Sequence, residues 1–444
     1  MKPVCKLMFL NTFMLKEWCV RQWVKSSTNG IHVAPTQNVT KRNVQNSVKR
    51  DFVRSHLEAL PKLPSHYCRA SSSKMYLEQT FHSYADVYSS YCDKESQEDR
   101  EPVSRMIFME EFNKMNLEIF IPKKDQCDLC CSYEEGNLAD EEYQIHVSRK
   151  EESRKEKASD KEIAIKSNGE IVLLTVDVQA VLIAPFLKAS ALYYKTKLAC
   201  HNYTVYNMVT KQPVCYLWHE GEGEMSSSMF ASCLLDYFKS EEVPQKVKEI
   251  IIYSDGCAAQ NRNVVLSNAL LHFAITSGIT VTQKYLERGH TQMECDSVHS
   301  VIERKRKNCK ISVPAQYADI IENARSRDQI PYKVKYVDHT FFKYYSRIKY
   351  YNSLRPGKKT GDPCVNDLRC IKYSQTEQIT FKLHYSDAWS TLPQRTKSGF
   401  TDSDVKQLYN ARLCITKQKY EDLQSLKPVL KSDYHAFYDN LPYK

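Results

Sequence analysis

Residues 249–263 read EIIIYSDGCAAQNRN, and the architecture of the chain can be worked out from this stretch. A short apolar run rich in β-branched residues and closed by a polar turn is typical of a buried strand. Asp255 would then lie at the carboxyl end of that strand, where an open α/β sheet presents its functional groups. An apolar helix over 264–276, which Gly278 ends as a C-terminal cap, and a second strand over 279–286 follow. The stretch therefore predicts a strand–helix–strand unit with a carboxylate at the tip of its first strand.

The segments before this unit predict three more strands and a helix. Residues 170–183 (EIVLLTVDVQAVLI) favour one long buried strand with Asp177 in its middle. Strands over 201–208 and 214–218 and a helix over 229–239 follow. The resulting order is strand, strand, strand, helix, strand, helix, strand, helix, which is the element order of the ribonuclease H-like fold. The predicted class is α/β (α+β overall), with a ribonuclease H-like mixed sheet flanked by a helical N-terminal region and a small C-terminal β-rich region.

Three acidic positions in this core predict a site for divalent metal. A carboxylate inside an apolar strand such as Asp177 is costly unless it is paired or metal-bound. Two Asp residues on neighbouring strands, Asp177 and Asp255, would repel each other without a cation between them. On the helix that starts near residue 296, Asp296, His299 and Glu303 share one face. Asp296 is the favoured third ligand because it lies at the helix start, and Glu303 is the alternative. We expect Mg2+ or Mn2+ at this site. The alternative is that Asp177 has a structural role and is satisfied by local hydrogen bonds.

Further residues are candidates for catalysis and for contact with nucleic acid. His290 or His299 could orient the nucleophile or protonate the leaving oxygen. Basic residues after the acidic helix face could follow phosphates, and a basic turn near residue 357 lies within an aromatic and basic β-rich segment that could bind a nucleic-acid backbone. A purely structural β-rich segment is the other interpretation. The basic candidates are Lys305, Arg306, Lys307, Lys358 and Lys359.

A single CxxC motif, Cys127 to Cys130, predicts a zinc site. Two thiolates separated by two residues can bind one Zn2+ from a tight turn, but a structural site needs two further ligands. His146 and His66 are the preferred ligands to complete it. Two unliganded core thiols are the alternative.

Composition shifts divide the chain into six predicted regions. They are a basic helical region with possible DNA contact over 1–120, the CxxC zinc-type motif over 121–150, a charged connector over 151–169, the ribonuclease H-like core over 170–327, a β-rich appendage over 328–400 and C-terminal helices over 401–444.

The charge distribution and the cysteines indicate the cellular compartment in which the protein works. The 444 residues carry a net charge of +10, and residues 1–50 hold nine Lys/Arg against one Glu, a local charge of +8. This segment is either an exposed basic arm or a contact for nucleic acid. Lys41-Arg42 and Lys49-Arg50 form a weak nuclear-import-like pattern. The 16 scattered cysteines indicate a reducing compartment, and no apolar run of membrane-spanning length occurs. We therefore expect a nuclear, intracellular protein without a membrane segment.

Six motifs together resemble a family of uncharacterised, transposon-derived proteins that are abundant in invertebrates. The resemblance covers nearly the whole chain and implies a DDE/DDD transposase core of the ribonuclease H-like type. Members of that family have additional sequence before residue 4 and an Arg-Gly pair where this chain has Gly223-Glu224-Met225, which indicates a truncated or decaying copy. The motifs are SHYCR at 65–69, PKKDQCDLC at 122–130, TVDVQ at 175–179, YSDGCAAQNRN at 253–263, GHTQMECDSVHSVIE at 289–303 and RPGKKTGDP at 355–363.

Two functional hypotheses from different classes follow. The first is a transposase-derived, two-metal-ion nuclease or strand transferase that acts on DNA phosphodiesters. A homo-oligomer is a possible form of this enzyme. The second is a catalytically inactive, domesticated DNA- or protein-binding factor.

Overall fold

The computed structural model describes residues 6–12, 14–28, 31–32, 39–60, 62–64, 75–77, 81, 83–119, 127–325, 330–393 and 405–444. These residues divide into two compact units. One comprises residues 1–60 with 81–119, and the other comprises 61–80 with 120–444.

The first unit is built from helices. Its core consists of α3, α4 and α5, which bury Val53, Tyr91, Phe108 and Phe112. Helix α4 is capped by Ser83, whose side chain accepts from the backbone N–H of Asp86. The described elements are α1 (Lys6–Thr12), α2 (Glu17–Ser26), β1 (Ser27–Thr28), β2 (Ile31–His32), α3 (Val39–Ala59), α4 (Tyr84–Gln97), α5 (Arg105–Lys114) and β5 (Leu117–Ile119).

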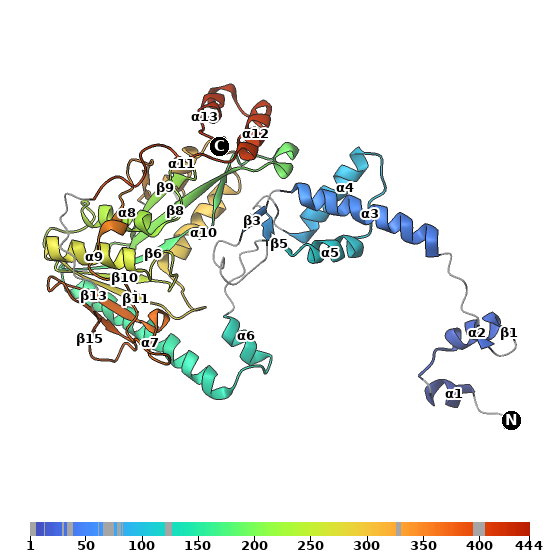
Figure 1. Cartoon of the computed structure of the whole chain (residues 1–444), viewed down its shortest axis with the longest axis horizontal. Helices are drawn as coiled ribbons and strands as arrows, with labels where there is room; N and C mark the ends of the chain where they lie inside the picture. Colours follow the sequence, from blue (N-terminus) through green and yellow to red (C-terminus); the bar gives the residue numbers. More distant parts are fainter. Residues whose placement is uncertain are drawn as a thin grey trace. The chain divides into compact units, whose positions relative to one another are not determined.

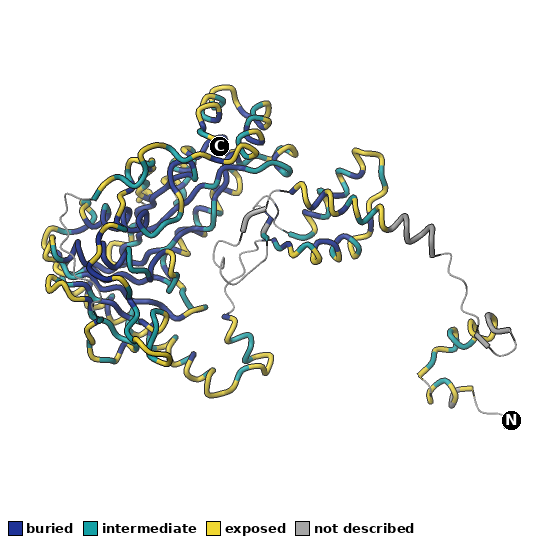
Figure 2. Tube along the Cα trace, in the orientation of Figure 1, coloured by how far each residue is buried: buried dark blue, intermediate teal, exposed yellow. Residues whose placement is uncertain are grey.

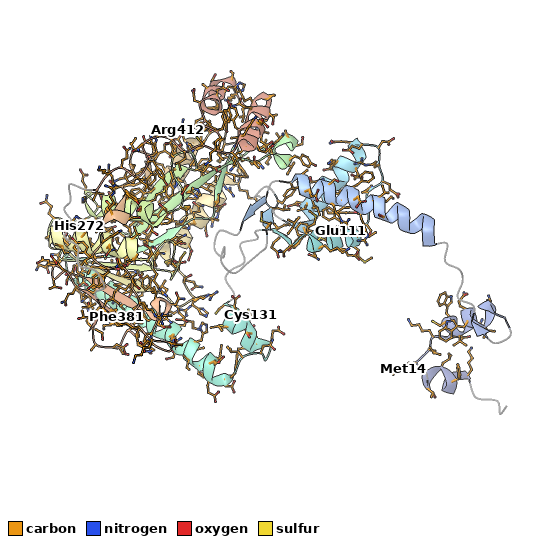
Figure 3. All side chains as sticks on the ribbon, in the orientation of Figure 1. Met14, Glu111, Cys131, His272, Phe381 and Arg412 are labelled. Atoms are coloured by element: carbon orange, nitrogen blue, oxygen red, sulfur yellow. The ribbon has the colours of Figure 1, made fainter. Side chains whose placement is uncertain are left out.

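Basic residues near residue 50 are paired within this unit. The fully buried carboxylate of Glu111, labelled in Figure 3, receives hydrogen bonds from Arg50 and Arg54 at 2.5 and 2.7 Å. Lys49 pairs with Glu101 at 2.8 Å. Part of the positive charge near the start of the chain is therefore neutralised by acidic side chains of the same unit.

The second unit contains a ten-stranded mixed sheet (Figure 1). The order along it is β12-β9-β8-β6-β10-β11-β13-β14-β15, and β7 pairs with β8 off this path. β6, β10 and β11 run parallel to one another, whereas β8 is antiparallel to β6 and β9. The strands are β6 (Ile171–Val178), β7 (Leu182–Ala184), β8 (Leu198–Asn207), β9 (Gln212–His219), β10 (Glu249–Ser254), β11 (Thr280–Tyr285), β12 (Lys333–Tyr336), β13 (Cys370–Tyr373), β14 (Ile379–Lys382) and β15 (Ser390–Thr391).

Helices cover both faces of this sheet, as the side chains of β6 show, because they point alternately to one face and the other. Val172, Leu174 and Val176 point to the face covered by α8 (Ser227–Phe238) and α9 (Val264–Ser277). Leu173 points to the opposite face, where it shares a core with Ala164 of α7 (Asp140–Lys166) and Cys295 of α10 (Glu294–Arg306). Asp177 has the parity of Leu173 and therefore faces the α7 and α10 side. The strands between these layers are the most buried part of the unit (Figure 2).

The predicted order of elements is confirmed from β6 to α10, with one correction. The segment predicted as one strand over 170–183 forms two, β6 and β7, so Asp177 lies one residue before the end of β6 and not in the middle of a strand. The chain turns after Val178, where Gln179 donates its N–H to the carbonyl of Asn202 at 2.9 Å. The expected cap at Gly278 is present, with φ of 78°.

The region over 328–400 is not a separate β-rich appendage. β12 pairs with β9 in parallel, and β13 pairs with β11 in antiparallel orientation, so this region extends the central sheet on both sides. Ile371, Tyr373 and Ile379 belong to the same hydrophobic core as α8 and α9. The alternating pattern predicted the strands correctly, but the pattern of one strand cannot identify its neighbour.

The segment predicted as a charged connector over 151–169 is mostly the second half of α7. Asp160 accepts hydrogen bonds from Tyr253 at 2.7 Å and from Lys284 at 2.6 Å, and Lys157 pairs with Glu294 at 2.8 Å. These contacts attach the helix to β10, β11 and α10. Charged side chains of α7 therefore hold the helix against the sheet.

The remaining described elements of this unit are short. None of the described helices combines the length and the apolar character that a membrane crossing requires. The remaining strands and α-helices of this unit are β3 (Lys62–Pro64), which pairs with β4 (Met75–Leu77), α6 (Asp128–Glu134), α11 (Gln316–Glu322), α12 (Lys417–Ser425) and α13 (His435–Asp439).

Candidate metal centres

Two cysteines and two histidines come together at the start of the second unit. His146 Nε2 lies 3.2 Å from Cys127 Sγ and 3.6 Å from Cys130 Sγ. His290 Nε2 lies 3.3 Å from Cys130 Sγ and 3.0 Å from His146 Nε2. All four ligand atoms lie within 4.8 Å of one another, so this group, the Cys/His group, could hold one metal ion.

Three separate segments supply the Cys/His group. The cysteines lie at the start of α6, and Cys131 in Figure 3 marks that helix. His146 lies on α7, which follows α6 after a turn at Gly136. His290 lies in the loop between β11 and α10. The group therefore joins a helical hairpin to a loop that leads directly into α10.

Gly289 allows this loop to approach the cysteines. Its φ is +75°, in the left-handed region that favours glycine. A Cβ atom at this position would lie 2.7 Å from Cys127 Sγ and 3.1 Å from Cys127 Cα. The close contact needs both the backbone conformation and the missing side chain of glycine.

The electrostatic environment suits metal ligation. Burial raises the pKa of Cys130, and the neighbouring sulfur of Cys127 raises it further, so two thiolates here need a cation. Burial lowers the pKa of His290, with a smaller contribution from His146, which favours the neutral imidazole that binds metal.

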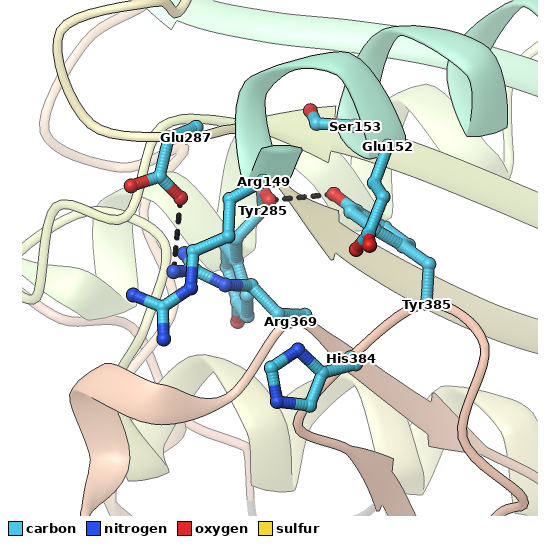
Figure 4. A pocket seen from close by; sticks show the side chains of 8 residues that line it. All are labelled: Arg149, Glu152, Ser153, Tyr285, Glu287, Arg369, His384 and Tyr385. Atoms are coloured by element: carbon cyan, nitrogen blue, oxygen red, sulfur yellow. Dashed lines mark hydrogen bonds and ion pairs between the residues drawn. The ribbon is translucent and has the colours of Figure 1, made fainter. Parts of the chain in front are cut away.

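A carboxylate stands behind His146. Glu287 Oε1 lies 3.5 Å from His146 Nδ1, and Glu287 Oε2 pairs with Arg369 at 2.9 Å (Figure 4). A carboxylate on the far ring nitrogen of a metal-binding histidine fixes the orientation of the ring.

His290 is the member that was not predicted for this group. The sequence suggested a catalytic role for it and gave His66 as a zinc ligand, but His66 lies outside the described residues. His290 follows Cys130 by 160 residues, so no local spacing could connect them. The one available signal was the Gly289-His290 pair directly after a strand.

A second group contains Asp177, Asp296 and His299, again with ligand atoms within 4.8 Å of one another. We call it the acidic group. Asp177 comes from the end of β6, and the other two come from the first turns of α10. Asp296 Oδ2 accepts the N–H of Met293 at 2.8 Å, which fixes the carboxylate at the start of the helix.

His299 is oriented by two neighbours. Its Nε2 lies 3.0 Å from Thr204 Oγ1, and its Nδ1 lies 3.9 Å from Asp177 Oδ2. The second distance is too long for a hydrogen bond and suits two ligands of one ion. Burial lowers the pKa of His299 to about 3, so the imidazole is neutral at physiological pH. A neutral imidazole can accept a hydrogen bond or bind a metal ion. It is a poor donor of the proton that His299 was expected to give to the leaving oxygen.

Asp255 directly follows β10, the strand next to β6. Tyr253 pairs with Thr175 in the parallel β6–β10 ladder, and in each segment an Asp follows two residues later in the chain. Asp255 Oδ1 accepts hydrogen bonds from Asn261 Nδ2 at 2.7 Å and from the N–H of Cys257 at 3.2 Å. Within the described residues, the acidic group does not include Asp255.

Glu303 makes other contacts. Its Oε1 accepts from Gln179 Nε2 at 2.8 Å, and its Oε2 pairs with Arg306 at 2.7 Å. The structure thus brings Asp296 together with Asp177 and places Glu303 in a local network two turns further along α10.

The basic candidates differ in exposure. Lys305 and Lys307 are exposed, whereas Arg306 is buried with its guanidinium over the ring of Phe186. Lys358 and Lys359 are exposed, and their backbone N–H groups bond to Asp362 Oδ2. Four of the five predicted phosphate contacts are therefore accessible, and Arg306 is part of the core.

The structure so far defines a mixed α/β protein with two groups of side chains that could hold metal. Residues 203–353 match a family model described as a domain of unknown function (DUF8701). The match includes Asp255, His290, Asp296 and His299, whereas Asp177 precedes it. No curated protein and no solved structure matches this chain.

Proposed function

We propose that this chain is a transposase-derived protein whose core cuts or joins DNA phosphodiesters with the help of Mg2+ or Mn2+. The observation that carries the proposal is the acidic group, in which Asp177 from a central strand meets Asp296 from α10. Asp255 directly follows the neighbouring strand, two residues after Tyr253, as Asp177 stands two residues after its partner Thr175. Three carboxylates from a sheet and a helix are the hard oxygen ligands that these cations prefer.

The sheet supports this assignment. In order of appearance, β6, β8, β9, β10 and β11 are strands one to five, and they lie side by side as three, two, one, four, five. This order, with the first and fourth strands adjacent and parallel, is the one expected for a ribonuclease H-like core, and it supports the proposal. The additional strands at both sides do not interrupt it.

Each residue then has a role in the reaction. Asp177, Asp255 and Asp296 would hold the cations and so set where the phosphodiester lies. Bound Mg2+ or Mn2+ would polarise the phosphoryl oxygen and make the attacking water or 3′-hydroxyl more acidic. His299, neutral and oriented by Thr204, adds a ligand nitrogen or positions Asp177. The exposed Lys305 and Lys307 neutralise the DNA backbone nearby.

For the Cys/His group we propose Zn2+. Zinc bonds of about 2.3 Å to sulfur and about 2.0–2.1 Å to nitrogen place the atoms of a tetrahedron about 3.3–3.8 Å apart. The four distances given above, from 3.0 to 3.6 Å, agree with this within a few tenths of an ångström. Four protein ligands leave no open position, so this metal would be structural.

The basic start of the chain supports a nuclear setting in which DNA is the partner. Part of its charge is used in ion pairs, such as Lys49 with Glu101. The affinity for DNA should still fall steeply with salt, because phosphate contacts release counterions.

A cleavage assay on supercoiled and linear DNA with Mn2+ tests the proposal. We expect nicking by the full chain and none by Asp177→Asn or Asp255→Asn. Glu220→Gln is a suitable control, because Glu220 lies away from the acidic group and pairs with Lys419. DNA binding without cleavage in any metal would favour the inactive, domesticated binding factor instead.

A further inference from the structure

The α7 side of the sheet is open to solvent at one end. On β13, Lys372 lies between two residues of the core that α8 and α9 cover, so it points to the opposite side of the sheet. Thr380 pairs with Lys372 in the β13–β14 ladder, and Lys382 follows on the same side two residues later. These three residues are partly exposed, whereas Leu173 on the same side of β6 is fully buried. The sheet is therefore accessible on this side over β13 and β14.

Trp389 lies on the accessible side, directly before β15. The centre of its ring is 4.5 Å from Lys372 Nζ and 5.0 Å from Lys382 Nζ. Trp389 is itself partly exposed. The electrons of an indole ring attract cations, so two ammonium groups that project from the sheet hold the ring in place. We call these three residues the Trp/Lys surface.

The two lysines of the Trp/Lys surface have no carboxylate partner in the part of the chain that the structure describes. Lys382 Nζ donates to the backbone carbonyl of Tyr385 at 3.1 Å, and neither ammonium group takes part in an ion pair there. On the neighbouring strand β11, by contrast, Lys284 pairs with both Glu156 and Asp160 of α7. The positive charge of this sheet side is thus neutralised under α7 and uncompensated beyond it.

The nearest acidic residue along the chain is already in use. Asp387 Oδ2 accepts the backbone N–H groups of Leu383 at 3.2 Å and of His384 at 2.7 Å, which closes the turn after β14. A partner of the Trp/Lys surface would therefore have to supply the negative charge itself.

We propose that the Trp/Lys surface binds single-stranded DNA, with an unpaired base on the exposed part of Trp389 and the adjoining phosphates on Lys372 and Lys382. Every base has a flat face that stacks on an aromatic ring, and the phosphates supply the charge that this surface lacks. Bases in a duplex already stack on one another, so the surface favours an unpaired strand. This assignment deepens the proposed function and rests on it, because a core that cuts or joins DNA handles free strand ends.

The test is binding of a labelled single-stranded oligonucleotide by the full chain without added Mg2+ or Mn2+, measured as anisotropy over a series of salt concentrations. Trp389→Leu should weaken binding about 10-fold and leave the salt slope unchanged, because a stacked base is lost and no phosphate contact is. Trp389→Phe should keep most of the affinity, since its ring still stacks. The double variant Lys372→Gln/Lys382→Gln should reduce the salt slope by about 1.4, at about 0.7 for each phosphate contact with a single strand.

Tryptophan fluorescence gives a second readout. The chain has four tryptophans, of which Trp218 is fully buried. A base stacked on Trp389 should quench part of the emission when the oligonucleotide is added. Trp389→Phe should lose this part of the quenching while it still binds.

Tyr344→Leu is a matched control. Tyr344 is also an exposed ring beside a cation, with the guanidinium of Arg347 at 5.8 Å from its centre. It lies on the other side of the sheet, because the N–H of the next-door Lys343 bonds to Ser232 of α8. Its loss should leave affinity and salt slope unchanged. A duplex of the same sequence controls for the ligand, and Trp389→Leu should change its affinity much less.

The outcomes separate this proposal from the proposed function. Single-strand binding that depends on Trp389 in a protein that never cuts DNA would support the Trp/Lys surface and contradict the catalytic role. Cleavage together with unchanged single-strand affinity in Trp389→Leu would overturn the surface alone. If Trp389→Leu does not fold, the quenching in Trp389→Phe and the slope of the lysine double variant decide. Full displacement of the oligonucleotide by poly-glutamate without quenching would assign the surface to an acidic protein instead, and a wild-type chain that does not bind single-stranded DNA overturns the proposal.

Discussion

Gly289 is the residue on which the Cys/His group depends most directly. Its positive φ and its contact with Cys127 are two separate constraints. Gly289→Ala should therefore abolish zinc retention and lower the melting temperature, because the methyl group collides with backbone as well as with sulfur. Zinc content by atomic absorption and thermal unfolding measure the two effects.

The variant Gly136→Ala separates the effect of the positive φ from the effect of the collision with Cys127. Gly136 has nearly the same φ, +74°, but a Cβ atom there would meet nothing within 4 Å. We expect the strain of a positive φ alone, about 1 kcal/mol, with full zinc content. Equal zinc loss in both variants would mean that the collision at Cys127 is unimportant.

Asp296 and Glu303 can be ranked by their contacts. Asp296 belongs to the acidic group, whereas Glu303 is occupied by Gln179 and Arg306. Asp296→Asn should reduce Mn2+-supported cleavage by more than about 100-fold, because a metal ligand is lost. Glu303→Gln should keep most of the activity and lose some stability. The reverse ranking, with both variants folded, would transfer the ligand role to Glu303.

At the level of single residues, the sequence predicted ligands that lie on one element or on neighbouring strands. Asp177, Asp255 and Asp296 were chosen because carboxylates in apolar strands and at helix starts need partners, and the structure brings Asp177 and Asp296 together. His290 was missed because its partners in the Cys/His group come from segments far away in the sequence.

Among the elements, the loop between β11 and α10 connects the two candidate metal centres. His290 belongs to the Cys/His group, and Asp296 of the acidic group lies six residues later. Removing zinc should therefore release the start of α10 and impair cleavage even when Mg2+ or Mn2+ is abundant. Dialysis against a chelator followed by Mn2+ alone should not restore activity, whereas Zn2+ plus Mn2+ should.

Two cysteine variants check this coupling. Cys130→Ser should reproduce the effect of the chelator, because it removes a ligand. Cys131→Ser should not, since Cys131 is the adjacent cysteine and is not a member of the Cys/His group. Full cleavage by zinc-free protein would show that the loop holds its position without the metal.

Elements with a strong hydrophobic period were predicted within a few residues. α9 begins at the expected residue and ends one residue later than expected, and β11 is one residue shorter at each end than expected. α7 was harder, because its charged surface gives almost no period, and its attachment depends on buried polar contacts such as Asp160 with Lys284. The position of β13 beside β11 follows from long-range pairing that no local pattern contains.

For the molecule as a whole, the two compact units should differ in their response to acid. Burial pushes the pKa of Glu111 upward, but hydrogen bonds from three cationic side chains outweigh it and hold the pKa at about 2. Because the folded pKa lies below the unfolded value, this stabilisation is complete above about pH 4.5 and is lost as the pH falls toward 2. The donors are Lys114, Arg54 and Arg50.

Hydrogen exchange over α3 and α5 between pH 6 and pH 3 measures this effect. We expect protection in the helical unit to fall before that of the sheet, and Glu111→Gln to lower protection at pH 6 and to flatten the dependence. Glu101→Gln should change little, because its pair with Lys49 is exposed. A wild-type profile that stays flat down to pH 3 would contradict the role of Glu111.

The short outer strands of the sheet have a consequence for self-association. β15 has two residues, and β12 has four, of which Lys333 and Lys335 form ion pairs with Glu242 and Asp236. Lysines and brief strands at a sheet margin oppose the docking of a foreign strand. Two copies of this chain would therefore not fuse their sheets into one continuous ribbon, and a homo-oligomer would use its helices and loops. The same margins protect a chain with so many buried β-branched residues from fibril growth while it is folded.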